Sequence, residues 1–253
     1  MAEHGISAAS DSSDRKRRFL LVVDSDVNNL FYTSALLKRF DYRTCTARTA
    51  REAIELTSSA VPSLVITALG LNDMDGLELM QRLKENPAFA AVPFIAMGKQ
   101  GDLRTEMRSF DQGALDCLDQ PVSAELLYRA VQAATETRPR TCIRLRTLLP
   151  VKENNSPLSG PENTCTMDLS ERGMFLRAAK PFGVNTRLSL QIYLYGQVIP
   201  VEAVVVYSDA TGEGPFAGPG MGLEFVRIEP KDRELIRQFV RSEITRGVSP
   251  RDA

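Results

Sequence analysis

The sequence predicts two domains in tandem, an α/β domain and then a β domain. The first is a doubly wound sheet of five parallel strands, and the second is a small antiparallel six-stranded β-barrel with a C-terminal helix. In the first half, short apolar runs alternate with segments of helical periodicity, as in successive βα units. In the second half, apolar residues recur at every second position. The 253 residues suffice for two domains, because a domain takes roughly 100–200 residues.

The first half contains five predicted βα units in succession. The expected strands cover residues 19–24, 43–47, 63–68, 93–97 and 116–118. The expected helices cover residues 29–39, 49–59, 77–86, 102–112 and 123–137. The second of these helices opens on a capping box, in which the Thr49 hydroxyl accepts from the amide of Glu52 and the glutamate reaches back. Units of this length are typical of a parallel sheet with helices on both faces.

The second half contains strands that alternate apolar and polar residues. Leu188, Leu190, Ile192 and Leu194 point one way, and the intervening residues point the other way. Further strands are expected at 198–207 and 222–227, and an amphipathic helix at 232–245. Residues 152–161 and the Gly/Pro-rich segment 211–220 are expected to be loops, the latter mobile.

The domain boundary is expected near Pro139, because a helix usually ends before the residue that precedes a proline. We therefore expect a disordered tail at 1–17, the α/β domain at 18–137 and the β domain at 138–248. The tail has no apolar signal region, and no uncharged stretch reaches the roughly 18 residues of a transmembrane helix. These features predict a cytoplasmic protein without a membrane partner.

Composition excludes several functions. The single histidine, His4, lies in the expected tail, which argues against zinc sites and histidine-dependent catalysis. We expect no catalytic residues, no metal and no cofactor. A net charge of −1 gives no reason to expect DNA as a partner. The four cysteines share no CxxC spacing and are predicted to be buried, reduced thiols: Cys45, Cys117, Cys142 and Cys165.

Residues 19–135 contain four landmarks in order: Asp24 after the first strand, Asp73-Met-Asp75-Gly76 after the third, Pro93 before the fourth and Gln120-Pro121 after the fifth. With these landmarks the segment resembles a response-regulator receiver domain. A working receiver accepts a phosphoryl group on an aspartate at the end of its third strand. The position that corresponds to this aspartate is Ala68, whose methyl group cannot accept it.

Other positions depart from the receiver pattern as well. The acidic pair is Asp24-Ser25, the switch position is Gly98 (or Met97, if shifted by one), and the lysine position is Gln120. The sequence therefore predicts a pseudo-receiver. We expect Asp24 and Asp26 to cap the first helix, and Asp73 and Asp75 to belong to a turn. Phosphorylation of a neighbouring aspartate or a residual metal site is the alternative. The resemblance implies that the last two helices mediate dimerisation or partner docking.

Two motifs occur within residues 139–245: the RxxxR pair of Arg140 and Arg144, and the DxSxxG turn of Asp168, Ser170 and Gly173. Together, in this order, they resemble a PilZ domain, a family that binds cyclic di-GMP. The resemblance implies that these five residues bind the nucleotide, although Arg138 could replace one member of the arginine pair. Arginine suits this ligand, because its planar fork binds phosphate and guanine and stacks on bases.

The leading hypothesis is a non-enzymatic cyclic di-GMP receptor. The ligand would order the RxxxR arm on the barrel and shift inter-domain or partner contacts. The alternative is a nucleotide-independent interaction scaffold in a two-component or motility/biofilm pathway. A phosphorylated regulator, an enzyme and a DNA-binding protein fit the residues less well. Each motif also has an interpretation without a ligand. The DxSxxG segment would then be only a structural turn, and the two arginines of RxxxR would be solvated residues of a linker.

Overall fold

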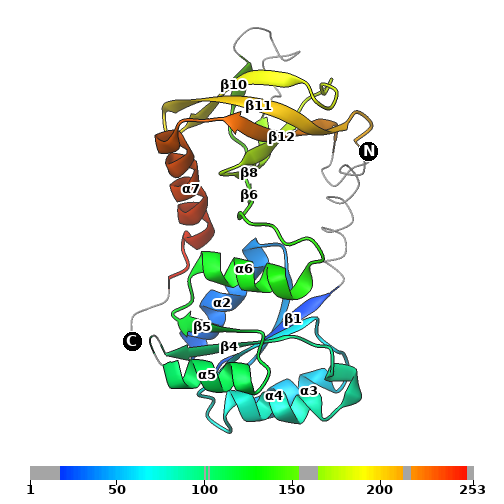
Figure 1. Ribbon diagram of the computed structural model, residues 1–253, viewed down its shortest axis with the longest axis vertical. Helices are drawn as coiled ribbons and strands as arrows, with labels where there is room; N and C mark the ends of the chain where they lie inside the picture. Colours follow the sequence, from blue (N-terminus) through cyan, green and yellow to red (C-terminus); the bar gives the residue numbers. More distant parts are fainter. Residues whose placement is uncertain (1–17, 100, 102, 154–164, 213–217, 250–253) are drawn as a thin grey trace. The chain divides into compact units, whose positions relative to one another are not determined.

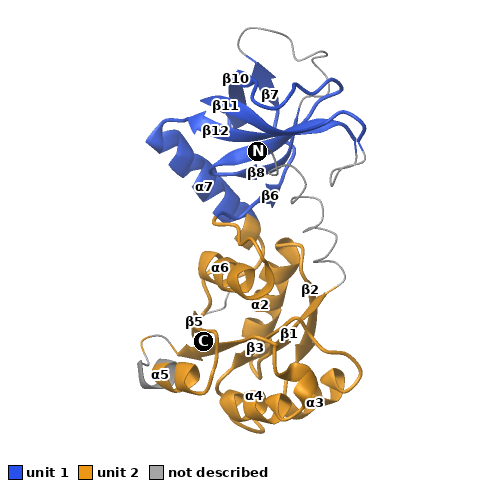
Figure 2. Cartoon of the chain, turned by 45° about the vertical axis from the view of Figure 1, so that its right-hand side comes forward, with its two compact units in different colours: residues 1–13, 142–243 blue, residues 14–141, 244–253 orange. Residues whose placement is uncertain are grey.

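The computed structural model describes residues 18–99, 101, 103–153, 165–212 and 218–249 (Figure 1). The expected tail, most of the predicted loop 152–161 and the centre of the predicted loop 211–220 lie outside the described residues. The chain divides into two compact units (Figure 2). Among the described residues, the α/β unit comprises residues 18–141 with 244–249, and the β unit comprises residues 142–243.

The α/β unit is built on a five-stranded parallel sheet in the order β2-β1-β3-β4-β5, which confirms the predicted doubly wound architecture. The sheet core is apolar because β1, β3 and β4 consist largely of buried aliphatic residues. The strands are β1 Phe19–Val23, β2 Arg43–Ala47, β3 Leu64–Ala68, β4 Phe94–Lys99 and β5 Asp116–Gln120.

Five α-helices and one short 3₁₀-helix connect these strands. Their bounds differ by only a few residues from those predicted, except that a 3₁₀-helix follows the third expected helix. The helices are α2 Val27–Arg39, α3 Ala50–Thr57, α4 Gly76–Lys84, η1 Pro87–Phe89, α5 Leu103–Asp111 and α6 Ala124–Thr135. None of the described helices in the chain is long and apolar enough to cross a membrane.

The helix caps confirm part of the prediction and correct the rest. Asp26 caps α2, as expected, by accepting from the amides of Asn28 and Asn29. Asp24 does not cap this helix. Asp75 caps its own helix, α4, but Asp73 accepts from the amides of Ala50 and Arg51, at the start of α3. Asp73 therefore binds a helix that is distant in sequence, which a local turn motif could not reveal.

The β unit is a curled antiparallel sheet with the strand order β6-β8-β9-β12-β11-β10-β7, and a C-terminal helix. The sheet contains seven strands where six were predicted. Its elements are β6 Leu145–Arg146, β7 Val151–Glu153, β8 Cys165–Ser170, β9 Gly173–Arg177, β10 Arg187–Leu194, β11 Gln197–Asp209, β12 Gly220–Arg227 and α7 Pro230–Thr245.

The extra strand arises because Pro150 interrupts the segment after Arg144, which forms two short strands, β6 and β7, in place of one. A proline has no amide hydrogen and breaks a strand ladder. The two pieces, β6 and β7, lie at opposite edges of the sheet although they belong to one short segment. Between them, Leu149 accepts from the amide of Thr166 on β8, and Pro150 accepts from the amide of Tyr193 on β10. The interrupted segment therefore bonds to both edges of the sheet.

Helix α7 packs on the sheet with the apolar stripe that the sequence predicted. Ile236, Phe239 and Val240 are buried. The Phe239 ring also meets the ring of Tyr195 edge-on, with 5.3 Å between centroids. Tyr195 and Gly196 form the turn between β10 and β11, and both have positive φ, as expected of a two-residue hairpin turn. This turn thus presents an aromatic ring to the helix.

The prediction of buried cysteines was wrong. All four thiols are free, Cys45 is exposed, and the other three are partly exposed. Cys45 lies on β2, which is an edge strand, and three of the five β2 residues are exposed. Apolar or β-branched neighbours in the sequence do not predict burial in an edge strand, because no other described strand pairs with the outer edge of β2.

Candidate functional site

The α/β unit has a cavity of about 480 Å³ where its strands end. The carboxyl ends of parallel strands meet at one edge of a sheet, and crevices form there in doubly wound folds. The cavity is lined by residues that follow four of the strands and by the start of α2: Asp24, Ser25, Asp26, Asn29, Ala68, Leu69, Gly70, Asn72, Met97, Gly98, Lys99 and Gln120.

Asp24 lines this cavity, together with the four positions that depart from the receiver pattern, Ser25, Ala68, Gly98 and Gln120, and with Met97, the other candidate for the switch position. Ala68 ends β3 and is almost fully buried. Ser25 donates its hydroxyl to the carbonyl of Arg48 and accepts from the amide of Asn72, so it organises the surrounding loops. Lys99 also lines the cavity and was not singled out from the sequence, because the strand was predicted to end at Met97.

Asp24 is the buried carboxylate of this cavity, with 3% of its surface exposed. It accepts from the amide of Asp26 at 2.9 Å and from the side-chain amide of Gln120 at 2.7 Å. Burial raises the pKa of Asp24 above its ordinary value, although these two hydrogen bonds act in the opposite direction. The side chain that donates to this carboxylate, that of Gln120, is thus a neutral amide and not a cation.

No group of three or more metal-ligating side chains occurs among the residues that the structure describes. A divalent cation such as Mg²⁺ needs several oxygen ligands in near-octahedral geometry. The cavity offers a buried Asp24, while the Ser25 hydroxyl is already bonded to Arg48 and Asn72. These donors fit a Mg²⁺ site poorly.

In the β unit, the DxSxxG motif is the hairpin between β8 and β9. Ser170 pairs with Gly173 across the two strands, so Glu171 and Arg172 form the turn. The Ser170 hydroxyl donates to the carbonyl of Gly173 at 3.1 Å, which closes the turn. The register shifts between Thr166 and Asp168, and such a bulge re-aims the side chains that follow it.

Residue 173 is glycine because the backbone of β12 approaches it closely. A Cβ atom built on it would lie 2.2 Å from the carbonyl oxygen of Leu223 on β12. The neighbouring carbonyl of Arg172 accepts from the amide of Phe225, also on β12. The absence of a side chain at Gly173 therefore allows the hairpin to pack against β12.

The two arginines of the RxxxR motif fall in different units. Arg140 belongs to the α/β unit, where its amide donates to the side-chain oxygen of Gln132 at 2.8 Å. Gln132 is fully buried on α6 and donates to the hydroxyl of Tyr42. Arg144 belongs to the β unit and directly precedes β6. The arginine stretch reaches the DxSxxG hairpin through β6, because Arg146 pairs with Asp168.

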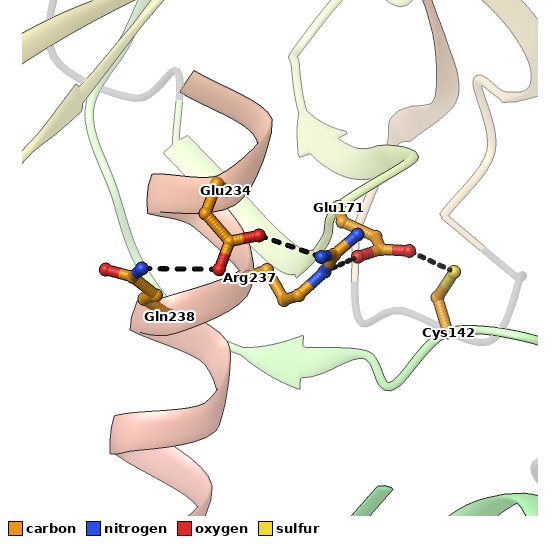
Figure 3. A network of polar contacts seen from close by, with 5 residues as sticks. All are labelled: Cys142, Glu171, Glu234, Arg237 and Gln238. Atoms are coloured by element: carbon orange, nitrogen blue, oxygen red, sulfur yellow. Dashed lines mark hydrogen bonds and ion pairs between the residues drawn. The ribbon is translucent and has the colours of Figure 1, made fainter. Parts of the chain in front are cut away.

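Glu171 occupies an unspecified position of the DxSxxG motif, so the motif did not single it out. Its carboxylate accepts from the thiol of Cys142 at 3.2 Å and from Nε of Arg237 at 2.5 Å (Figure 3). Burial alone would raise the pKa of Glu171. The hydrogen bonds from Arg237 and Cys142, together with the charges of Arg237 and Arg172, hold this pKa below its ordinary value.

The fold agrees with comparisons to known families. The chain matches the response regulator receiver domain over residues 20–132 and the PilZ domain over residues 136–242. It therefore consists of a receiver domain followed by a PilZ domain. This combination supports a role in signalling through cyclic di-GMP.

Individual relatives match about half of this chain. "Transcriptional regulatory protein ZraR" of Escherichia coli (strain K12) is 29% identical over 116 residues, which are 46% of this chain and 26% of that protein. A protein of Vibrio cholerae named "Probable cyclic di-GMP phosphodiesterase" is 28% identical over 119 residues, 47% of this chain and 27% of that protein. The chain thus spans about a quarter of the length of these curated relatives.

A solved receiver domain is also similar to this chain. The signal receiver domain of an HD domain-containing protein from Pseudomonas fluorescens Pf-5 is 28% identical, with a TM-score of 0.44. The similarity covers 47% of this chain and 94% of that one.

Proposed function

We propose that the protein is a non-enzymatic receptor for cyclic di-GMP. Arg140, Arg144, Asp168, Ser170 and Gly173 are the proposed ligand-binding positions. The observation that carries the proposal is the pairing of β6 with β8, in which Arg146 lies opposite Asp168. This pairing brings the chain that follows Arg144 alongside the DxSxxG hairpin, although the two motifs are far apart in the sequence.

The chemistry of the hairpin suits a guanine nucleotide. A carboxylate such as that of Asp168 can accept from the Watson–Crick edge of guanine, which presents N–H donors. An arginine can bind a phosphate through two parallel hydrogen bonds and can stack on a base. The interior of the hairpin is already closed by Ser170 and by the fit of Gly173 against β12. The hairpin is therefore a rigid support onto which a more mobile arginine stretch can fold.

The proposed role of the α/β unit is that of a pseudo-receiver. Ala68 provides no phosphoryl acceptor at the end of β3, and Gln120 replaces the cation expected beside the carboxylate. Helices α5 and α6 remain available for dimerisation or partner docking. Large apolar side chains are exposed on these helices and on the loop before β5, namely Met107, Phe110, Leu115 and Leu126.

The proposed response begins at the arginine arm. Arg140 is tied by its backbone to Gln132 of the receiver's last helix, and the strand after Arg144 is tied to the hairpin. A ligand that orders the segment between them changes the conformations available to that segment. A ligand with different affinities for those conformations shifts their populations, and this shift would alter inter-domain or partner contacts.

Calorimetric titration with cyclic di-GMP tests the proposal on the full-length protein. We expect micromolar affinity, which corresponds to about −8 kcal/mol, and its loss in Arg144→Ala and in Asp168→Ala. Arg187→Ala is the matched control, because it removes an exposed arginine from β10, which is separated from the hairpin strands by β11 and β12. Absence of binding by the wild-type protein would overturn the receptor proposal and favour the nucleotide-independent scaffold.

A further inference from the structure

Glu171 connects the arginine arm to the C-terminal helix within the β unit (Figure 3). We define the arm as residues 140–144, and Cys142 is midway between its two arginines. One carboxylate oxygen of Glu171 accepts from Cys142, and the other accepts from Arg237 on α7. Both oxygens are thereby used, so the carboxylate has a defined orientation between the arm and the helix.

The helix side of this contact is itself held in place. Arg237 donates through a second nitrogen to Glu234 at 2.8 Å, one turn earlier on α7. Gln238 donates to the other oxygen of Glu234 at 3.2 Å. The side chain of Glu171 is only 20% exposed, and that of Arg237 is 39% exposed. The ion pair is therefore less screened by water than a fully exposed one.

The position of Glu171 raises an electrostatic problem for the proposed ligand. Cyclic di-GMP carries two negative charges, and an uncompensated carboxylate in the DxSxxG turn would repel it. Arg237 neutralises this carboxylate and keeps it directed toward Cys142. We infer that Glu171 is a positioning residue for the arginine arm, and that Arg237 is the counter-ion that makes the turn compatible with an anionic ligand. The inference rests on the proposed function.

Loss of the Arg237 charge should therefore weaken nucleotide binding more than loss of the Glu171 charge. In Arg237→Gln, the carboxylate remains without its main counter-ion and repels the nucleotide. In Glu171→Gln, the charge is gone, but a side-chain oxygen remains to accept from Cys142. Replacing both residues by glutamine also leaves a neutral turn with an acceptor for Cys142. The double variant should therefore bind better than Arg237→Gln alone, which a purely structural role would not produce.

A double-mutant cycle measured by calorimetric titration with cyclic di-GMP tests this expected order of affinities among the variants. We expect Arg237→Gln to weaken binding about ten-fold, and Glu171→Gln and the double variant to stay within about three-fold of wild type. Arg237→Lys keeps the positive charge and should also stay within about three-fold. Lys231→Gln is the matched control, because it removes an exposed charge from the start of the same helix, and we expect no change from it. Wild-type affinity in Arg237→Gln, or additive losses in the double variant, would overturn the inference.

The arm side of the contact has its own conservative pair of variants. Cys142→Ala removes the donor to Glu171 and should weaken binding about three-fold, whereas Cys142→Ser keeps a donor and should restore it. Equal affinities in these two variants would contradict the positioning role. Thermal unfolding of every variant separates loss of fold from loss of binding. If wild type does not bind at all, the proposed function fails. If wild type binds and Arg144→Ala does not, the cycle tests Glu171 alone.

Discussion

Asp24 in the α/β unit and Glu171 in the β unit are held in different ways. In the α/β unit, the carboxylate of Asp24 is buried beside the neutral amide of Gln120, and its pKa is raised. In the β unit, the carboxylate of Glu171 is bonded to the guanidinium of Arg237, and its pKa is lowered. The comparison shows that a carboxylate beside a neutral amide has a raised pKa, whereas one bonded to a guanidinium has a lowered pKa.

Two glycines provide the largest test, because the backbone of another segment approaches each of them closely. A Cβ atom on Gly76 would lie 2.2 Å from the carbonyl oxygen of Ala68, and one on Gly173 would lie 2.2 Å from that of Leu223. Since backbone cannot move aside cheaply, we expect Gly76→Ala and Gly173→Ala each to destabilise their own unit by about 3 kcal/mol. Hydrogen exchange followed on peptides from each unit measures this.

The matched controls are Gly70→Ala in the α/β unit and Gly183→Ala in the β unit. A Cβ atom on either would meet nothing within 4 Å. Both controls should stay close to wild type. Wild-type protection in Gly173→Ala would show that the hairpin can retreat from β12, and would weaken the case for a rigid hairpin.

Restoring charges to the cavity gives the second test. Ala68→Asp adds a carboxylate to the cavity that already contains Asp24, without a cation at Gln120. We expect this variant to lose about 2 kcal/mol of stability, and Gln120→Lys in the same chain to recover about half of it. Urea unfolding measures both. A destabilisation by Ala68→Asp that Gln120→Lys does not reduce would mean that steric crowding, and not charge, governs the cavity.

A phosphorylation assay on the wild type and on the double variant tests the pseudo-receiver proposal. Wild-type protein incubated with a small phosphodonor and Mg²⁺ should show no added phosphoryl group by intact-mass analysis. Phosphorylation of the wild-type chain would refute the proposal and would place the acceptor on another aspartate. The Ala68→Asp/Gln120→Lys variant shows whether the remaining cavity can still support the reaction.

Removing the buried charge of Asp24 is expected to change the stability of the fold least, and to increase it where the other substitutions decrease it. A carboxyl group with a raised pKa in the folded state destabilises the fold as the pH rises above 3.8, its ordinary value. Asp24→Asn should therefore stabilise the protein by about 1 kcal/mol near pH 7. The gain should shrink as the pH falls through the raised pKa. The new amide can still accept from Asp26, and Gln120 can rotate to accept in turn.

Thermal unfolding near pH 7 and near pH 4 checks this prediction. Asp119→Asn is the control, because Asp119 is exposed on β5 and directly precedes Gln120 in the sequence. It should change stability little at either pH. A loss of stability in Asp24→Asn at neutral pH would mean that the hydrogen bonds from Asp26 and Gln120 outweigh the cost of burying the charge.

The sequence by itself determined both architectures and the identities of the two motifs. Strand and helix periodicities are local properties, and apolar runs such as Leu64–Ala68 leave little choice of structure. The alternation in Arg187–Leu194 and the stripe on α7 were equally direct. The replacement of charged groups at Ala68 and Gln120 could also be read from the sequence, because motif spacing fixes which positions correspond.

Only the tertiary structure decided which groups contact one another. The bond between Gln120 and Asp24, the cap that Asp73 provides to α3, and the exposure of Cys45 each depend on elements that are distant in sequence. The contacts of Glu171 with Cys142 and Arg237 join three separate segments. A sequence pattern has a period of a few residues, whereas these contacts depend on strand order and on how a helix packs against the sheet. For that reason the motifs were predictable and their partners were not.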